Sequence, residues 1–248
     1  MNELYGANLA WVYDEIYQGF IDYKAEYQFF KRICKEYKCD RILELACGTG
    51  NLSESFTKDF KRYVGLDFSE AMLKIAKKKF PDGKFVQGDM RCLNFEKQFD
   101  AVLITGRSTS YLMNDSDLQQ TFTSVQKSLT TGGIFVFDTI NADLFMPFIS
   151  QNEFVTHRSE IEGKKYERDS RWKKQESDRY HLIAWAAEYF RTDETNRFFL
   201  GKDETIFRVF TPQEISTILN KTGFEILKIQ ERETYAFATN VFVCRRLV

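Results

Sequence analysis

The sequence contains little of several residue types that mark particular protein classes. Histidine occurs twice and proline three times, and the five cysteines include no Cys-x-x-Cys pair. We therefore expect no metal site, and the cysteines fit a reduced, cytoplasmic protein. The first residues lack the basic start and apolar run of a signal peptide. No apolar stretch approaches the ~20 residues of a membrane span.

No charge of one sign dominates the chain. The formal net charge is −1, and the short basic clusters at 77–79 and 164–165 are typical of solvated faces. We therefore expect no nucleic-acid partner and no membrane partner. A hydrophobic content of 43% with 29% charged residues is that of an ordinary globular protein.

Strand-like and helix-like segments alternate over the first part of the chain. Short apolar strands are predicted at 41–46, 63–68, 84–87, 99–105 and 134–138. Helices are predicted between them, with Ser69 as one N-cap and Ser116 with Gln119 as a capping box before another. This alternation predicts a mostly parallel sheet with helices on both faces.

The pattern changes after Asp138. Strand-like runs at 180–190 and 205–210 lack helical spacers, which predicts an inserted antiparallel β region after the fifth strand. A new helix should start at Thr211, and two final strands near 225–231 and 240–246 can pair as a hairpin. The predicted fold is α/β and Rossmann-like, with a mostly parallel seven-stranded sheet whose last strand is antiparallel.

Residues at the ends of the first three strands suit an adenosine. Gly48 and Gly50 follow the first strand, where the missing side chains let the backbone approach a ligand. Asp67 ends the second strand, where a carboxylate can accept hydrogen bonds from both hydroxyls of a ribose. Gly88 and Asp89 end the third, where a carboxylate can accept a hydrogen bond from an adenine amino group. Carboxyl ends of parallel strands share one edge of a sheet, so the three positions predict one site.

Glu44 narrows the choice of ligand, because it lies in the strand just before the glycine loop. An anion there would repel a pyrophosphate but suits a ligand that carries an ammonium group. The loop also lacks the third glycine of the dinucleotide pattern, which disfavours the alternative of an NAD(P)-dependent oxidoreductase. S-adenosyl-L-methionine has an ammonium, a sulfonium and no phosphate.

Several segments together resemble the motifs of class I S-adenosylmethionine-dependent methyltransferases. They are Glu44–Gly50, Gly65–Ser69 with Met72, Gly88–Met90, Phe99–Val102 and Gly132–Asp138. The resemblance covers residues 41–138 in order and resumes at 211–246. It implies S-adenosyl-L-methionine as the cofactor and in-line methyl transfer to a nitrogen or oxygen of a small-molecule acceptor. A protein that binds the cofactor without turnover is the alternative.

The resemblance also implies individual roles. Glu44, Gly48 and Gly50 would surround the methionine part of the cofactor, and Asp67 would hold the ribose. Phe68 and Met90 would join Asp89 around the adenine, while Thr105 would face the reactive end. Ala46 departs from the family, which often has glycine there. The predicted cofactor-binding residues are Tyr23, Glu44, Ala46, Gly48, Gly50, Asp67, Phe68, Met72, Gly88, Asp89, Met90 and Thr105.

The segment Tyr13-Asp14-x-x-Tyr17, followed by Asp22-Tyr23, resembles a narrower group that includes small-molecule and aminosugar N-methyltransferases. In that group an N-terminal helix covers the cofactor, and strands inserted after the fifth strand build the acceptor pocket. The resemblance divides the chain into a helical cap (1–40), a cofactor domain (41–138 and 211–248) and an inserted substrate region (139–210). Exposed aromatic residues expected on the inserted strands are compatible with a homodimer.

Five residues are candidates for contact with the acceptor, and none is ranked as a base, which is needed only if the acceptor arrives protonated. They are Tyr13, Tyr17, Arg107, Tyr111 and Glu188. Structural alternatives remain, because Tyr13 and Tyr17 could belong to an aromatic core and Glu188 could face solvent. Asp138 could equally be a pocket residue or the cap of its strand.

Overall fold

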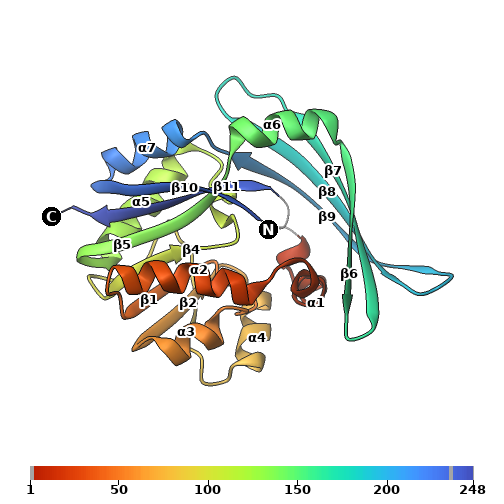
Figure 1. The fold of residues 1–248 in the computed structure, drawn as a ribbon, viewed down its shortest axis with the longest axis horizontal. Coiled ribbons are helices and arrows are strands. Elements are labelled where there is room, and N and C mark those ends of the chain that lie inside the picture. Colours follow the sequence, from red (N-terminus) through yellow and green to blue (C-terminus); the bar gives the residue numbers. More distant parts are fainter. Residues whose placement is uncertain (1–2, 235–236, 248) are drawn as a thin grey trace.

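The structure, a computed structural model, describes residues 3–234 and 237–247 and contains two β-sheets (Figure 1). The larger sheet has seven strands in the order β10-β11-β5-β4-β1-β2-β3. Their bounds are Phe224–Glu233 (β10), Ala238–Arg246 (β11), Leu129–Ile140 (β5), Phe99–Ile104 (β4), Arg41–Leu45 (β1), Arg62–Asp67 (β2) and Phe85–Gln87 (β3). The smaller sheet pairs β6 (Phe154–Ile161), β7 (Lys164–Gln175), β8 (His181–Thr192) and β9 (Arg197–Val209) in chain order.

Seven α-helices and two short 3-10 helices, η1 and η2, occur in the part of the chain that the structure describes. The α-helices are α1 (Ala10–Phe20), α2 (Tyr23–Glu36), α3 (Ser53–Asp59), α4 (Glu70–Lys79), α5 (Asp115–Ser128), α6 (Ala142–Gln151) and α7 (Pro212–Lys221). η1 covers Glu3–Tyr5 and η2 covers Ser108–Tyr111. None of the described helices is long and apolar enough to cross a bilayer.

The large sheet is buried on both faces, as the predicted near-continuous apolar strands require. Side chains of β1 alternate, so Ile42 packs toward α2 and α3 while Leu43 packs toward α5 and α7. The first five strands run parallel, and β11 lies antiparallel between β5 and β10. The prediction of a Rossmann-like, mostly parallel seven-stranded sheet whose last strand in the chain is antiparallel is confirmed.

The second sheet follows β5 in the chain, as predicted, and all its neighbouring strands are antiparallel. Its inner face packs against α1, where Val12 and Ile16 contact Tyr166 and Tyr189. The fit is close, because a Cβ placed on Gly19 of α1 would lie 2.4 Å from the Ser159 Cβ of β6. Figure 1 shows α1 between this sheet and the larger one.

Two local predictions need correction. The helix predicted from Ser116 begins at Asp115, and its N-cap is Asn114, whose side chain accepts from the Asp117 amide at 2.9 Å. The Ser116 and Gln119 capping box is therefore wrong, since both residues lie inside the helix. Helix α6 was not predicted at all, and it contains Pro147. By contrast, Ser69 caps α4 as predicted.

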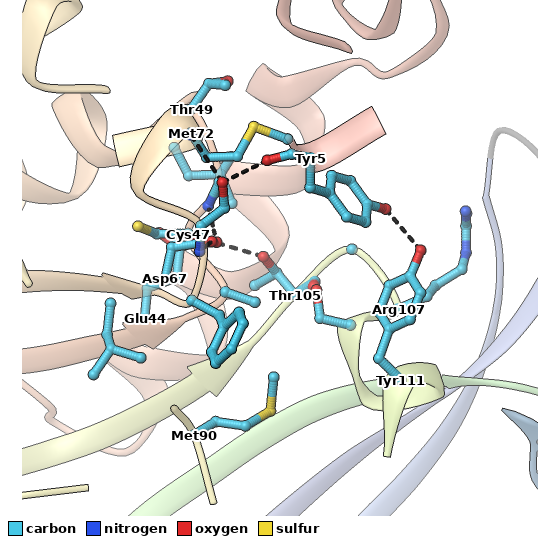
Figure 2. Close-up of a pocket in the computed structure, with 18 of the residues that line it drawn as sticks. Tyr5, Glu44, Cys47, Thr49, Asp67, Met72, Met90, Thr105, Arg107 and Tyr111 are labelled. Atoms are coloured by element: carbon cyan, nitrogen blue, oxygen red, sulfur yellow. Dashed lines mark hydrogen bonds between the residues drawn. The ribbon is translucent and has the colours of Figure 1, made fainter. Parts of the chain in front are cut away.

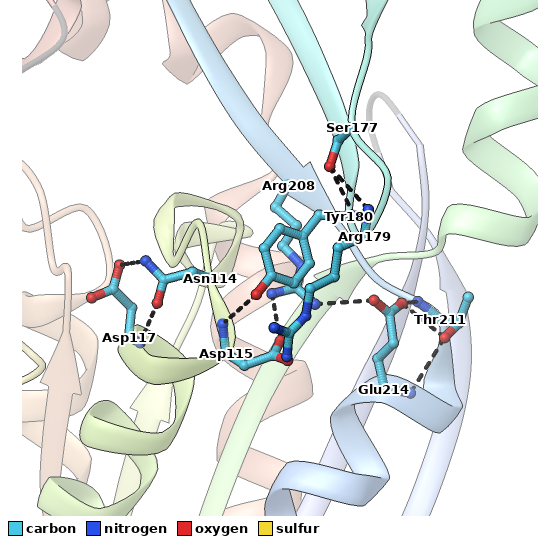
Figure 3. A network of polar contacts seen from close by, with 9 residues as sticks. All are labelled: Asn114, Asp115, Asp117, Ser177, Arg179, Tyr180, Arg208, Thr211 and Glu214. Carbon is cyan, nitrogen blue, oxygen red and sulfur yellow. Dashed lines mark hydrogen bonds and ion pairs between the residues drawn. The ribbon is translucent and has the colours of Figure 1, made fainter.

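Helix α7 begins as its sequence predicts. The Thr211 hydroxyl accepts from the Glu214 amide at 3.3 Å, and the Glu214 carboxylate accepts from the Thr211 amide at 2.8 Å. The same Glu214 forms an ion pair with Arg208 of β9, whose guanidinium also pairs with Asp115 at the start of α5 (Figure 3). One buried arginine therefore joins the inserted sheet to two helices of the larger domain.

Candidate active site

Four polar side chains lie on one face of the large sheet at the carboxyl ends of neighbouring strands. Strand alternation directs Asp67 (β2), Glu44 (β1), Thr105 (after β4) and Asp138 (β5) to the face that α2 and α3 cover. All four are buried, and Glu44 is only 2% exposed. A row of this kind places three carboxylates along the edge at which open α/β sheets bind ligands.

Glu44 is held by two hydroxyl groups. The Tyr63 hydroxyl donates to Glu44 Oε2 at 2.5 Å, and the Thr105 hydroxyl donates to Oε1 at 3.0 Å. Burial raises the pKa of Glu44 to about 7, although both hydrogen bonds oppose the rise. The negative charge of Asp67 adds to it. A cation bound here would therefore be stabilised strongly by the ionised form.

Asp67 closes the glycine loop onto the end of β2. Its Oδ2 accepts from the Gly48 amide at 2.8 Å and its Oδ1 accepts from the Ser69 amide at 2.7 Å. Burial raises the pKa of Asp67, and these backbone hydrogen bonds oppose the rise. Each carboxylate oxygen retains a further acceptor site, so the group can still accept from two hydroxyls of a ligand.

The backbone after β1 turns through left-handed residues. Ala46 has a φ of 56°, and Gly48 has the same value. A Cβ placed on Gly48 would meet no atom within 4 Å, so it would project into open space beside the loop. Gly50 differs, because its Cβ would lie 3.2 Å from Ala76 and 3.3 Å from Phe85. Gly48 therefore keeps space free for a ligand, whereas Gly50 permits close packing within the protein.

A cavity of about 350 Å³ opens over this row of side chains. Most of the predicted site residues line it, namely Tyr13, Tyr23, Glu44, Ala46, Gly48, Asp67, Phe68, Met72, Gly88, Asp89, Met90, Thr105, Arg107 and Tyr111. The volume lies in the range typical of small-molecule sites. Figure 2 shows many of these side chains around the cavity.

Three predicted site residues do not line the cavity. Gly50 packs against α4, as described above. Tyr17 lies behind Tyr13, with the two rings stacked at 4.3 Å, and its hydroxyl accepts from Arg168 at 2.8 Å. Glu188 lies on β8 between Ala187 and Tyr189, which face inward, so its side chain points to the opposite face of the second sheet.

The end of the cavity near β3 carries the residues predicted for adenine. Asp89 accepts from the Arg91 guanidinium at 2.6 Å, and this contact holds the pKa of Asp89 below its usual range. The Phe68 side chain is 55% exposed and lines the cavity, as does Met90. An exposed aromatic ring and a thioether beside a permanent carboxylate suit a flat heterocycle with an amino group.

Tyrosine rings form the other side of the cavity. The Tyr5 and Tyr111 hydroxyl oxygens lie 2.8 Å apart, and the Tyr5 ring also contacts Tyr13 edge to face at 5.6 Å. Burial raises the pKa of Tyr5 far above its usual value, so this hydroxyl keeps its proton and does not act as a base. In the view of Figure 2, Thr105 lies between the Glu44 and Asp67 side and this tyrosine pair.

Tyr5 belongs to an N-terminal segment that is tied to the cofactor side. Ser69 donates to the Tyr5 carbonyl at 2.5 Å. Asp14 of α1 accepts from the Thr49 hydroxyl at 2.5 Å and from Lys79 at 2.7 Å. These contacts hold η1 and α1 over the glycine loop, so the segment closes one side of the cavity.

The end of the cavity near β5 contains Arg107, Asp138, Glu26 and Thr234. The Arg107 amide donates to Asp138 Oδ1 at 2.7 Å, and its guanidinium donates to the Thr234 hydroxyl. Arg107 has a left-handed backbone, with a φ of 65° directly after Gly106 at 66°. Two consecutive left-handed residues turn the chain away from β4 and aim the Arg107 amide at β5.

Among the described residues that line the cavity, none belongs to the inserted region 139–210. The reason is the position of α1 and η1, which lie between the inserted sheet and the cavity. Leu4, Leu9 and Tyr17 pack on the inner face of that sheet. The inserted sheet therefore supports the wall that Tyr5 and Tyr13 form, instead of forming the wall itself.

The sequence interpretation did not include Tyr5, Glu26 or Thr234 among the site residues, and it left Asp138 open. Tyr5 ends the short helix η1 and Thr234 follows β10, and neither belongs to a sequence motif. Glu26 lies on α2 and forms an ion pair with Arg232 of β10 at 2.7 Å, a contact between segments far apart in the chain. Asp138 could have been found from the sequence, because it ends the predicted strand 134–138. The face of the sheet on which its side chain lies depends, however, on the pairing of β5 with β4.

The cavity fits S-adenosylmethionine in charge as well as in size. Among the residues that the structure describes, neither Glu44 nor Asp67 has a cationic partner, and both accept hydrogen bonds from uncharged donors. Two buried anions without counter-ions favour a ligand that brings positive charge and hydroxyl groups. A phosphate-bearing nucleotide would meet repulsion at the same place.

Comparisons with known proteins agree with this chemistry. Residues 42–133 match the family model described as a methyltransferase domain. The chain is 32% identical over 197 residues to the putative methyltransferase YqeM of Bacillus subtilis (strain 168), a match that covers 76% of this chain and 75% of that protein. It is 36% identical over 138 residues to a dTDP-3-amino-3,4,6-trideoxy-alpha-D-glucopyranose N,N-dimethyltransferase of Streptomyces venezuelae.

The second of these matches covers 54% of this chain and 58% of the relative. A crystal structure of Streptomyces venezuelae DesVI superposes with a TM-score of 0.80 at 24% identity, over 96% of this chain and 97% of that one, which supports the fold. The same family is indicated by the motifs, by the fold and by a relative that is matched over three quarters of its length. The chain belongs to the class I S-adenosylmethionine-dependent methyltransferases, as its sequence motifs predict.

Proposed function

We propose that this protein transfers the methyl group of S-adenosylmethionine to an amine of a small molecule. The observation that carries the proposal is the row of buried carboxylates at the strand ends, in which Glu44 and Asp67 face the cavity and have no cationic partner among the described residues. The relatives named above include an amino-sugar N,N-dimethyltransferase, which favours nitrogen over oxygen as the nucleophile.

Different residues of the cavity would bind different parts of the cofactor. Glu44 with the Gly48 loop would bind the methionine ammonium, Asp67 the ribose hydroxyls, and Phe68, Asp89 and Met90 the adenine. The bound sulfonium supplies an already activated methyl group. The chain must therefore mainly orient the acceptor and exclude water, tasks for which the Tyr5, Tyr13 and Tyr111 rings are placed.

Calorimetric titration with S-adenosylhomocysteine tests the binding part of the proposal. Asp67→Ala should weaken the affinity at least about tenfold, since hydrogen bonds to a charged group are lost. Asp82→Ala, at an exposed turn residue outside the cavity, is the matched control and should leave the affinity unchanged. The absence of binding to the unaltered protein would refute the proposed function.

An acceptor screen tests the transfer part. The protein is incubated with methyl-labelled S-adenosylmethionine and a panel of amines, each paired with the matching alcohol and including dTDP-linked amino sugars. We expect label in amines only. Transfer confined to alcohols would leave the cofactor assignment intact and overturn the choice of nitrogen.

We further propose that the protein forms a homodimer through the second sheet. Phe154, Phe198, Phe199 and Ile206 of β6 and β9 are exposed, and Phe199 has 58% of its surface accessible. Apolar side chains gathered on one sheet favour association. Light scattering after size exclusion tests this, and Phe199→Lys should shift the mass towards that of the monomer.

A further inference from the structure

We propose that Asp138 is the proton acceptor for the amine in the methyl-transfer step. The inference rests on the proposed function and deepens it, since it assigns a group to the one chemical event that the cofactor does not supply. An amine with a pKa near 10 is almost fully protonated at neutral pH, and its lone pair is then blocked.

The position of Asp138 in the strand order carries the argument. Along one edge of the sheet, Asp67, Glu44, Thr105 and Asp138 lie at or near the carboxyl ends of β2, β1, β4 and β5, which are neighbours in that order. Two strand spacings, about 10 Å, separate β1 from β5, and the register places Asp138 two residues beyond the level of Glu44. A ligand held at its ribose by Asp67 and at its ammonium by Glu44 leaves the space between Thr105 and Asp138 to the acceptor.

The hydrogen bonding of Asp138 leaves one oxygen available. Oδ1 accepts from the Arg107 amide at 2.7 Å, which fixes the orientation of the carboxylate. Oδ2 accepts no hydrogen bond from any residue in the ranges 3–234 and 237–247, although the side chain lines the cavity and is only 5% exposed. Glu44 and Asp67 differ, because both of their oxygens already accept from the protein.

The other candidates along this wall are weaker proton acceptors. Tyr5 holds its proton because its pKa is raised far above the usual value. Glu26 lines the cavity, but both its oxygens accept from the Arg232 guanidinium, at 2.7 and 2.8 Å. Arg107 has no acceptor atom on its side chain. Asp138 is thus the carboxylate on this side that retains a free acceptor position within the described part of the chain.

The proposed step balances in atoms and charge. The acceptor ammonium gives one proton to ionised Asp138 and becomes a neutral amine. The nitrogen lone pair forms the N–C bond as the S–C bond breaks, so the product is a methylated ammonium and the donor leaves uncharged. Asp138 then releases its proton to solvent through the cavity, which restores the carboxylate for a second methylation.

The binding of sinefungin, a cofactor analogue, tests the proposed role of Asp138 and does not require the acceptor to be known. In this cofactor analogue an amine-bearing carbon replaces the methylated sulfur, so an ammonium lies where the methyl group would be. Asp138→Asn keeps an oxygen for the Arg107 amide and removes the charge. We expect Asp138→Asn to weaken sinefungin about tenfold or more and to change S-adenosylhomocysteine affinity less than about twofold. Glu44→Gln is the matched control and should weaken both ligands alike.

A measurement on the unaltered protein covers the case in which the variant fails to fold. Burial raises the pKa of Asp138 to about 6, while the charges of Arg107 and Arg232 lower it and that of Glu26 raises it. The ratio of sinefungin to S-adenosylhomocysteine affinity should therefore increase between pH 5 and 7. A constant ratio, or an equal loss of both ligands in Asp138→Asn, would overturn the inference. If the protein binds neither ligand, the proposed function fails and the inference fails with it.

Discussion

Tyr63 and Glu44 meet across the β1–β2 pair, where the Tyr63 hydroxyl donates to Glu44 Oε2 at 2.5 Å. The contact depends on Gly65, which lies opposite Glu44 in the strand register. A Cβ on Gly65 would lie 3.0 Å from the Tyr63 hydroxyl and 2.8 Å from Cys47 Sγ. The glycine thus leaves room for the hydroxyl to reach the buried carboxylate.

The pKa of Glu44 predicts how cofactor affinity depends on pH. Because burial raises that pKa to about 7 and a bound ammonium favours the ionised form, affinity should increase as pH rises from 6 to 8. Calorimetry with S-adenosylhomocysteine should show a gain of up to about tenfold per pH unit below the pKa. Glu44→Gln should bind weakly and without this dependence, and a flat profile for the unaltered protein would contradict the assignment.

Tyr63→Phe should move the same profile to higher pH. The hydroxyl stabilises the ionised carboxylate, so its removal raises the pKa of Glu44 further. The affinity at high pH should stay close to that of the unaltered protein, since Glu44 itself remains. A midpoint that stays in place would show that the Tyr63 hydrogen bond does not control the charge of Glu44.

The raised pKa of Glu44 also affects the stability of the folded protein. The pKa of Glu44 in the folded protein lies above the ordinary value of 4.5. The contribution of Glu44 to the free energy of unfolding is therefore fully present below pH 4.5 and is lost as the pH rises through about 7. Relative to the unaltered protein, Glu44→Gln should therefore gain stability between pH 5 and 8, by roughly 3 kcal/mol. Urea unfolding at several pH values measures this difference.

Features that depend on neighbouring residues in the sequence could be predicted, whereas features that depend on contacts between distant residues could not. The strands, the glycine loop and Asp67 follow from local patterns, and the structure brings Glu44, Asp67 and Thr105 to one cavity. The N-cap at Asn114 was missed because Ser116 offered a better local pattern. Which residue is used depends on where the chain leaves η2, and local sequence does not encode that.

Residues whose role depends on distant contacts were harder to predict. Tyr17 belongs to the same aromatic helix as Tyr13, yet only Tyr13 lines the cavity, because Tyr17 turns toward Arg168 of the second sheet. The face on which Glu188 lies depends on the register of β8 with its neighbours. A one-residue change in that register would have reversed its direction.

Ala46 predicts a stabilising substitution. Its φ of 56° lies in the left-handed region, where a Cβ is strained and glycine is not. Ala46→Gly should therefore raise the free energy of unfolding by about 0.5–1 kcal/mol, after allowance for the greater freedom of glycine in the unfolded chain. Ala25→Gly, at an exposed position in helix α2, is the control and should lower it by a similar amount. A loss in both variants would mean that the turn after β1 carries no strain.

Arg208 predicts a large loss of stability far from the cavity. Its side chain is 1% exposed, it pairs with Asp115 at 2.9 Å and Glu214 at 3.0 Å, and its guanidinium lies 4.0 Å from the Tyr180 ring centre. Arg208→Met keeps most of the volume but removes the charge that both carboxylates need. The free energy of unfolding should fall by about 3 kcal/mol.

Arg245→Met provides the matched control, because Arg245 pairs with Glu225 at 3.5 Å on the surface, where the two side chains are 43% and 50% exposed. A surface pair of this kind contributes less than about 1 kcal/mol. Since Arg208 does not line the cavity, S-adenosylhomocysteine affinity should remain unchanged in both variants whenever they are folded. Equal effects of the two substitutions would mean that the inserted sheet is held to α5 and α7 by apolar packing, with the buried arginine contributing no more than a surface charge.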